Sequence, residues 1–116
     1  MDRIRNQERR RSRRIHIGQS LHIRPSDPKD PPFEETATTK DVSRDGVYFL
    51  TGRAGYYLGM RLFVTVPFHS AGDPMNKYYL GQVARVVELT SGQWGVGIQL
   101  LSSLASPPAS PPSLHR

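Results

Sequence analysis

Residues Gln93–Leu101, QWGVGIQLL, alternate apolar side chains with small or polar ones. One face carries Trp94, Val96, Ile98 and Leu100, and the other carries Gly95, Gly97 and Gln99. A period of two predicts a half-buried strand whose apolar face joins a core. The glycines on the opposite face allow a neighbouring element to approach closely. Trp94 is therefore predicted to be a core residue, with a place on a ligand-binding face as the alternative.

Upstream of this strand, further segments show extended patterns separated by turn signals. They lie at residues 15–23, 34–42, 47–50, 60–68 and 77–89. Four prolines between residues 25 and 32 indicate an exposed loop, while SRDG at 43–46 and TSG at 90–92 are typical of tight turns. Together with the last strand they predict an all-β fold, a small six-stranded antiparallel β-barrel, because closure removes exposed strand edges.

The net charge of +6 is concentrated at the N-terminus. Residues 1–14, MDRIRNQERRRSRR, hold seven Arg and two acidic residues, so they carry +5 and leave +1 for the other 102 residues. Such an extension is typical of a solvated arm or of a nonspecific patch for nucleic acid or acidic lipid. Residues 103–116 are rich in Ser and Pro and have few apolar groups. We predict a flexible basic arm at 1–14, a barrel at 15–102 and a disordered tail at 103–116, for which a role as a proline-groove ligand is the alternative.

Several classes of protein are disfavoured by the sequence. It has no Cys, which excludes disulfides and thiol chemistry and favours a cytoplasmic setting. No apolar run approaches the roughly 20 residues that span a bilayer, and the arginines are not followed by the apolar stretch of a secretory signal. His16 and His22 would lie roughly 20 Å apart along their strand, too far to share a metal. Because nucleophile-elbow, Walker-loop and paired-carboxylate patterns are missing, we expect no enzyme, no metal site and no cofactor.

Two motifs carry more specific information. Asp41–Gly46, DVSRDG, has the pattern Asp-x-Ser-x-x-Gly between two predicted strands. Asp and Ser side chains that bond to the N–H groups of their own turn, followed by Gly, suit many tight connections. The arm contains Arg pairs at a spacing of four, which are common in so arginine-rich a stretch. Each motif alone is explained by a turn or by a solvated arm, but their combination around one small β domain is more selective.

That combination resembles the PilZ domain family. Residues Glu8–Arg14, ERRRSRR, stand immediately before the first strand, and the resemblance extends from residue 8 to about residue 102. It implies a six-stranded barrel that binds the bacterial second messenger cyclic di-GMP. The residues that match the family's Arg-x-x-x-Arg and Asp-x-Ser-x-x-Gly motifs are Arg10, Arg14, Asp41, Ser43 and Gly46.

The resemblance also implies how these residues act. Arginine forks suit both the phosphates and the O6/N7 edge of guanine, so Arg10 and Arg14 would grip the ligand as the arm closes over it. Asp41 would accept hydrogen bonds from guanine N1–H and N2–H₂, Ser43 would bond to a base or phosphate, and Gly46 would allow close backbone approach. A basic residue just before the first motif arginine accompanies a stacked pair of ligands in the family, so Arg9 favours two cyclic di-GMP molecules per site. Arg44 is either a further ligand contact or solvated.

The sequence therefore predicts a cyclic di-GMP receptor, without a membrane span, that changes conformation on binding and signals through an unidentified effector protein. One alternative is a small basic barrel that binds RNA or DNA nonspecifically, although the nearly neutral body argues against a basic groove for long nucleic acids. A second alternative is a PilZ-like protein-interaction adaptor that does not bind ligand.

Overall fold

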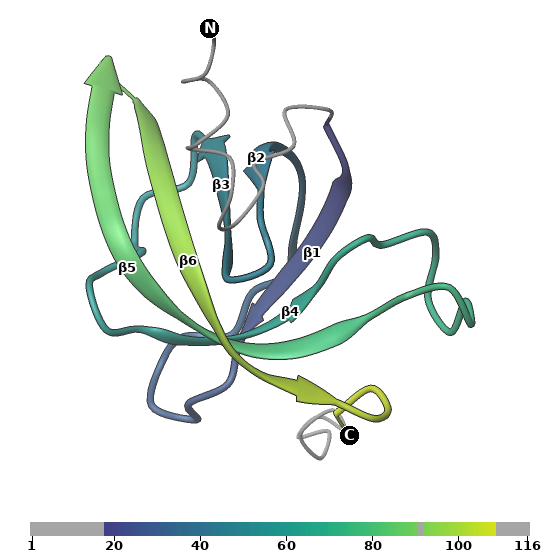
Figure 1. Cartoon of the computed structure of the whole chain (residues 1–116). Coiled ribbons are helices and arrows are strands. Elements are labelled where there is room, and N and C mark those ends of the chain that lie inside the picture. Colours follow the sequence, from purple (N-terminus) through teal and green to yellow (C-terminus); the bar gives the residue numbers. More distant parts are fainter. Residues whose placement is uncertain (1–17, 91, 109–116) are drawn as a thin grey trace, which may run out of the picture.

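A computed structural model describes residues 18–90 and 92–108 of the 116-residue chain. These residues form six strands and no helix, and therefore no helix long and apolar enough to cross a membrane. The strands are β1 (Ser20–Pro25), β2 (Glu35–Val42), β3 (Gly46–Thr51), β4 (Arg61–Thr65), β5 (Tyr78–Thr90) and β6 (Gln93–Leu104). All pairings are antiparallel in the order β1-β2-β3-β6-β5-β4, and β4 pairs with β1 to close the barrel (Figure 1). The predicted six-stranded antiparallel barrel is confirmed.

The alternating residues of the strands fill the barrel. On β3, Val47 and Phe49 are buried, and they lie opposite the equally buried Ile98 and Val96 of β6. The other strands contribute residues in the same way: Leu21 and Ile23 from β1, Leu62 and Val64 from β4, and Val83 from β5. Burial of such aliphatic and aromatic side chains contributes about 1.5–3 kcal/mol each relative to exposure. This core fixes the register of the strands, because a slip by one residue would turn it outward.

Three strands differ by several residues from the sequence-based prediction, and one of them, β4, ends at Thr65 rather than at Phe68. β1 begins at Ser20 rather than near residue 15 and runs on to Pro25, which was placed in the following loop. Proline is tolerated at this strand end because its lack of an N–H removes no hydrogen bond of the sheet there. β6 continues past the predicted strand end at Leu101, since Ser103 and Leu104 pair with Tyr79 and Tyr78. The predicted basic arm and the tail beyond residue 108 lie outside the described residues.

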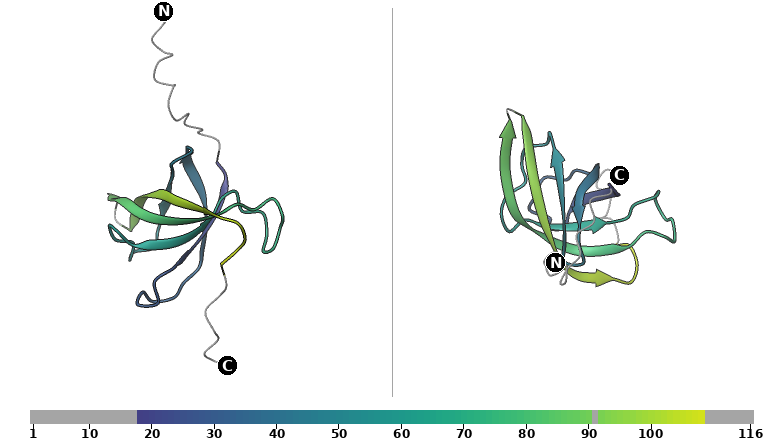
Figure 2. Two further views of the ribbon diagram at one scale, coloured as in Figure 1. Left: turned by 60° about the horizontal axis from the view of Figure 1, so that its bottom comes forward. Right: turned by 45° about the horizontal axis from the view of Figure 1, so that its top comes forward.

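The hairpin of β5 and β6 is the longest element of the molecule. The two strands lie side by side over their whole length and extend beyond the ends of β3 and β4 (Figures 1 and 2). Gly92 in the connecting turn has a φ of 81°, a left-handed value that disfavours side chains larger than glycine. The register shifts between Val83 and Arg85, and again between Glu88 and Thr90. These bulges bend the hairpin away from the rest of the barrel.

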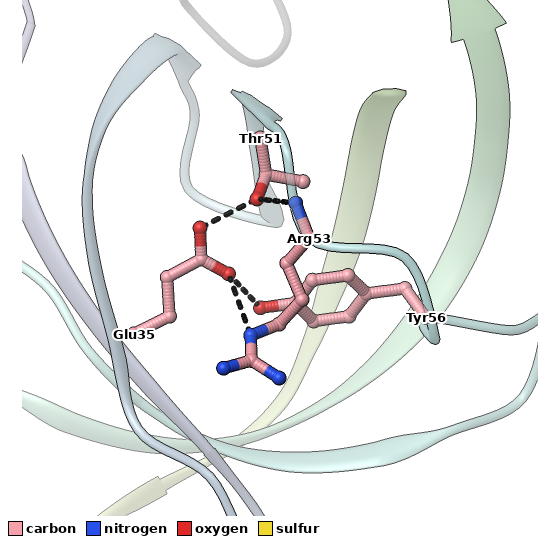
Figure 3. A network of polar contacts seen from close by, with 4 residues as sticks. All are labelled: Glu35, Thr51, Arg53 and Tyr56. Carbon is pink, nitrogen blue, oxygen red and sulfur yellow. Dashed lines mark hydrogen bonds and ion pairs between the residues drawn. The ribbon is translucent and has the colours of Figure 1, made fainter. Parts of the chain in front are cut away.

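Polar contacts anchor the loop after β3 to the neighbouring strand β2. The carboxylate of Glu35 accepts hydrogen bonds from Thr51 Oγ1 at 2.5 Å and from the Tyr56 hydroxyl at 2.6 Å (Figure 3). Arg53 Nε lies 3.9 Å from the same carboxylate, and its guanidinium stacks 4.1 Å from the centroid of the Phe33 ring. Burial, with the hydrogen bond to Glu35 as the next cause, raises the pKa of Tyr56 far above its ordinary value. The phenol is therefore held in its neutral, donating form.

Candidate ligand-binding groove

A groove with a volume of about 380 Å³ lies on the outer face of the barrel, where the β2–β3 turn meets β5 and β6. Asp41 at the end of β2, Ser43 in the turn and Gly46 at the start of β3 all line it. The register of β2 and β3, with Asp41 opposite Tyr48, places these residues at one corner of the outer face. A groove of this size is within the range of small-molecule sites. The structure thus brings together the three predicted site residues of the Asp-x-Ser-x-x-Gly motif.

The β2–β3 turn is held by its own hydrogen bonds. Ser43 N–H donates to the Gly46 carbonyl at 2.9 Å, and the Ser43 hydroxyl accepts from Asp45 N–H at 3.3 Å. The Asp45 carbonyl in turn accepts from Leu100 N–H at 2.9 Å, which joins the turn to β6. The hydroxyl of Ser43 therefore helps to fold the turn and at the same time borders the groove. A fixed turn presents its polar groups at little further entropic cost on binding.

Gly46 is required by close packing rather than by a left-handed backbone. Its φ is not among the positive values, but a Cβ at this position would lie 2.7 Å from the carbonyl oxygen of Ile98. Cβ atoms essentially never approach backbone oxygen so closely, so any side chain would push β3 and β6 apart. In the structure the close neighbour of Gly46 is the backbone of β6, while the predicted approach of Gly46 to a ligand stays a prediction.

Sequence reasoning missed two side chains that form the wall of the groove opposite the turn. Tyr48 on β3 lies over Gly95 and Gly97 of β6, where a Cβ at Gly95 would meet the Tyr48 hydroxyl. The guanidinium of Arg85 on β5 lies over the Tyr48 ring, 5.2 Å from its centroid. Arg85 is exposed and lines the groove, so its guanidinium is accessible to a planar group. The glycine face of β6 did predict a close neighbour, but the pattern could not show that this neighbour is an aromatic ring.

The charge balance of the described part of the groove is unfavourable for an anion. Its charged residues are Asp41, Asp45 and Arg85, two acids against one base. The carboxylates suit N–H donors such as the Watson–Crick edge of guanine, whereas phosphates require additional positive charge. The candidate residues Arg9, Arg10 and Arg14, which would supply it, lie outside the described residues.

Arg44 and Trp94 do not line this groove. The Arg44 side chain is 80% exposed, and its Nε lies 3.9 Å from an Asp45 carboxylate oxygen, a surface ion pair of small energetic value. Trp94 is half-buried and packs against the core, as predicted. It also borders a small apolar pocket of about 90 Å³ between the hairpin and the loop after β3, together with Tyr56 and Val86.

A second groove, of about 420 Å³, lies between the loop that joins β4 to β5 and the end of β6. It is slightly larger than the first but contains none of the predicted site residues. Its lining is a mixture of loop and chain-end residues, among them Asn76, Lys77 and Ser106. Within residues 18–90 and 92–108, no cluster of three or more His, Cys, Asp and Glu side chains could hold a metal ion.

Comparison with known proteins decides the family. The model of the PilZ domain matches residues 8–106, which contain both predicted motifs. The chain belongs to the PilZ domain family. PilZ domains are cyclic di-GMP-binding receptor or adaptor domains rather than enzymes. Among solved structures, the Bacillus subtilis inhibitor of motility (MotI/DgrA) is similar, with a TM-score of 0.61 and 13% identity. The match covers 84% of this chain and 44% of that one, so this chain spans less than half of its length. The likeness shows a shared fold, and no curated protein sequence matches this chain.

Proposed function

We propose that this PilZ domain is a cyclic di-GMP receptor that binds its ligand in the groove of Asp41, Ser43 and Gly46. The observation that carries the proposal is the convergence of these three residues on one groove beside the stacked pair of Tyr48 and Arg85. Asp41 would accept hydrogen bonds from the N1–H and N2–H₂ groups of a guanine. The Ser43 hydroxyl would bond to a base or phosphate. The guanidinium of Arg85 would stack on a purine, as arginine does in nucleotide sites.

The phosphates of the ligand would be held by Arg10 and Arg14. The described groove has more acid than base, so a dianionic ligand needs a source of positive charge, and seven arginines stand in residues 1–14. The arm would close over the ligand and so change the surface that an effector protein recognises. Arg9 would extend the site to a second, stacked ligand molecule. Such a receptor would act in a bacterial cytoplasm, where cyclic di-GMP serves as a messenger.

Calorimetric titration of the full chain with cyclic di-GMP tests the proposal. We expect saturable binding that is lost in Arg10→Ala and in Arg14→Ala and strongly weakened in Asp41→Ala. Arg44→Ala serves as the matched control, because the side chain is exposed and outside the groove. In Arg9→Ala we expect the stoichiometry to fall from two ligands per chain to one. A nonspecific nucleic-acid binder would instead show steeply salt-dependent affinity for RNA or DNA and indifference to Asp41→Ala. An adaptor without ligand would show no heat with any variant.

A further inference from the structure

The chain turns back on the barrel after β6 ends at Leu104 (Figure 1). Residues 105–107 are exposed, but Pro108 is half-buried again. Its carbonyl oxygen accepts a partly buried hydrogen bond of 2.9 Å from Nη2 of Arg24 on β1. In the closed barrel, β5 and β4 lie between β6 and β1. The segment after β6 therefore passes two strands before it reaches Arg24.

Arg24 belongs to a row of side chains on the outer face of the barrel. It lies opposite Phe63 of β4, and Phe63 lies opposite Leu80 of β5. The preceding residues on β1 and β4, Ile23 and Leu62, point into the core, so this row faces outward. The guanidinium of Arg24 lies over the Phe63 ring, 4.9 Å from its centroid. The row thus combines an apolar surface with a positioned hydrogen-bond donor.

The tail has the composition that such a surface binds. Residues 105–108 and 109–112 both read ASPP, and paired prolines favour the polyproline II conformation. This conformation has no internal hydrogen bonds, so its carbonyl groups need donors from outside. Proteins recognise it in grooves that are lined by aromatic side chains. A guanidinium held beside a phenylalanine ring offers both the donor and the aromatic surface.

We propose that Arg24 and Phe63 form a proline-binding site and that the chain's own tail occupies it about Pro108. Three strand spacings separate β6 from β1, which is about 14 Å. The four residues from Leu104 to Pro108 reach about 13–14 Å when extended, and the Arg24 side chain covers the remainder. The short tether gives the tail an effective concentration in the millimolar range, which a separate proline-rich segment would have to exceed. Neither Arg24 nor Phe63 lines the groove of Asp41, so this anchoring does not depend on cyclic di-GMP.

Backbone dynamics of the full chain, measured by NMR relaxation, test the proposal. Proline has no N–H, so the amides of Ser106 and Ala109 are the nearest reporters on either side of the first proline pair. We expect order parameters above about 0.6 for both in the wild type and below about 0.6 in Arg24→Met, which removes the donor. Arg61→Met is the matched control, because Arg61 is an exposed arginine on β4. A wild-type order parameter of Ala109 below about 0.6 would overturn the proposal, and so would unchanged values in Arg24→Met.

A spin label on the tail gives a second, independent measurement. The chain has no Cys, so Ser110→Cys accepts a single nitroxide label two residues after Pro108. We expect the label to broaden the amide signals of Arg24 and Phe63 more than that of Gly72, which lies in the β4–β5 loop beside the root of the tail. Equal broadening at the two places would contradict a seat at Arg24. Broadening in a separate chain that carries no nitroxide would also contradict it, because the tail of another copy would then occupy the site.

Discussion

Tyr56 and Tyr57 are adjacent in the sequence and allow a controlled test of the contacts that anchor the loop after β3. Each hydroxyl donates to a carboxylate, Tyr56 to Glu35 at 2.6 Å and Tyr57 to Asp30 at 2.8 Å. Tyr56 is 7% exposed, whereas Tyr57 is 47% exposed. A hydrogen bond to a charged group contributes about 1.5–3 kcal/mol when it is sheltered from water. We therefore expect Tyr56→Phe to lower the free energy of unfolding by about that amount and Tyr57→Phe to change it little.

The assay is urea denaturation followed by circular dichroism, in which the midpoint should fall for Tyr56→Phe with an unchanged slope. The pH dependence provides a second readout. Because the pKa of Tyr56 is raised in the folded protein, its contribution is fully present below the unfolded pKa of about 10 and is lost as pH rises further. The wild-type free energy of unfolding should therefore fall above about pH 10 more steeply than that of Tyr56→Phe. Equal midpoints for Tyr56→Phe and Tyr57→Phe at neutral pH would refute the reasoning.

Four further substitutions test the groove and its surroundings. Gly46→Ala should destabilise the fold by about 1–3 kcal/mol, since the new Cβ meets backbone 2.7 Å away; a wild-type urea midpoint would contradict this. Gly95→Ala should displace Tyr48 and weaken cyclic di-GMP binding about five- to tenfold. Gly97→Ala should weaken binding less, because the nearest neighbour of a Cβ at Gly97 is 3.4 Å away. If calorimetry shows a larger loss of affinity for Gly97→Ala than for Gly95→Ala, the proposed role of Tyr48 and Arg85 in stacking is wrong. Asp41→Ala should lose most of the affinity for cyclic di-GMP, and unchanged affinity would remove Asp41 from the site.

The barrel could be predicted because its strands alternate apolar and polar residues over short, well-punctuated segments. Val96 and Ile98 on β6 and Leu21 and Ile23 on β1 lie in the core as their spacing indicated. The turn at Ser43 was also predictable, because a serine hydroxyl that accepts from an N–H two residues on is a local interaction. Interactions between residues that are close in the chain can be predicted from the sequence alone, without knowledge of the tertiary structure.

The wall of the groove could not be predicted in the same way. The contact between Tyr48 and Arg85 depends on the registers of two strand pairs, which place Gly97 between them. The bulge after Val83 shifts Arg85 to the outer face, and a single sequence does not show where a bulge falls. The bonds of Glu35 to Thr51 and Tyr56 join residues that are distant in the chain. The sequence did not predict that β1 extends to Pro25 and β6 to Leu104, because proline and serine disfavour strands. In the structure, pairing with β4 and β5 keeps these strand ends extended.

Titration of the wild-type full chain with cyclic di-GMP tests whether the groove binds a cyclic dinucleotide. We expect saturable heat at two ligand molecules per chain and a higher melting temperature in the presence of ligand, because binding to the folded state stabilises it. The absence of both heat and a thermal shift would contradict it.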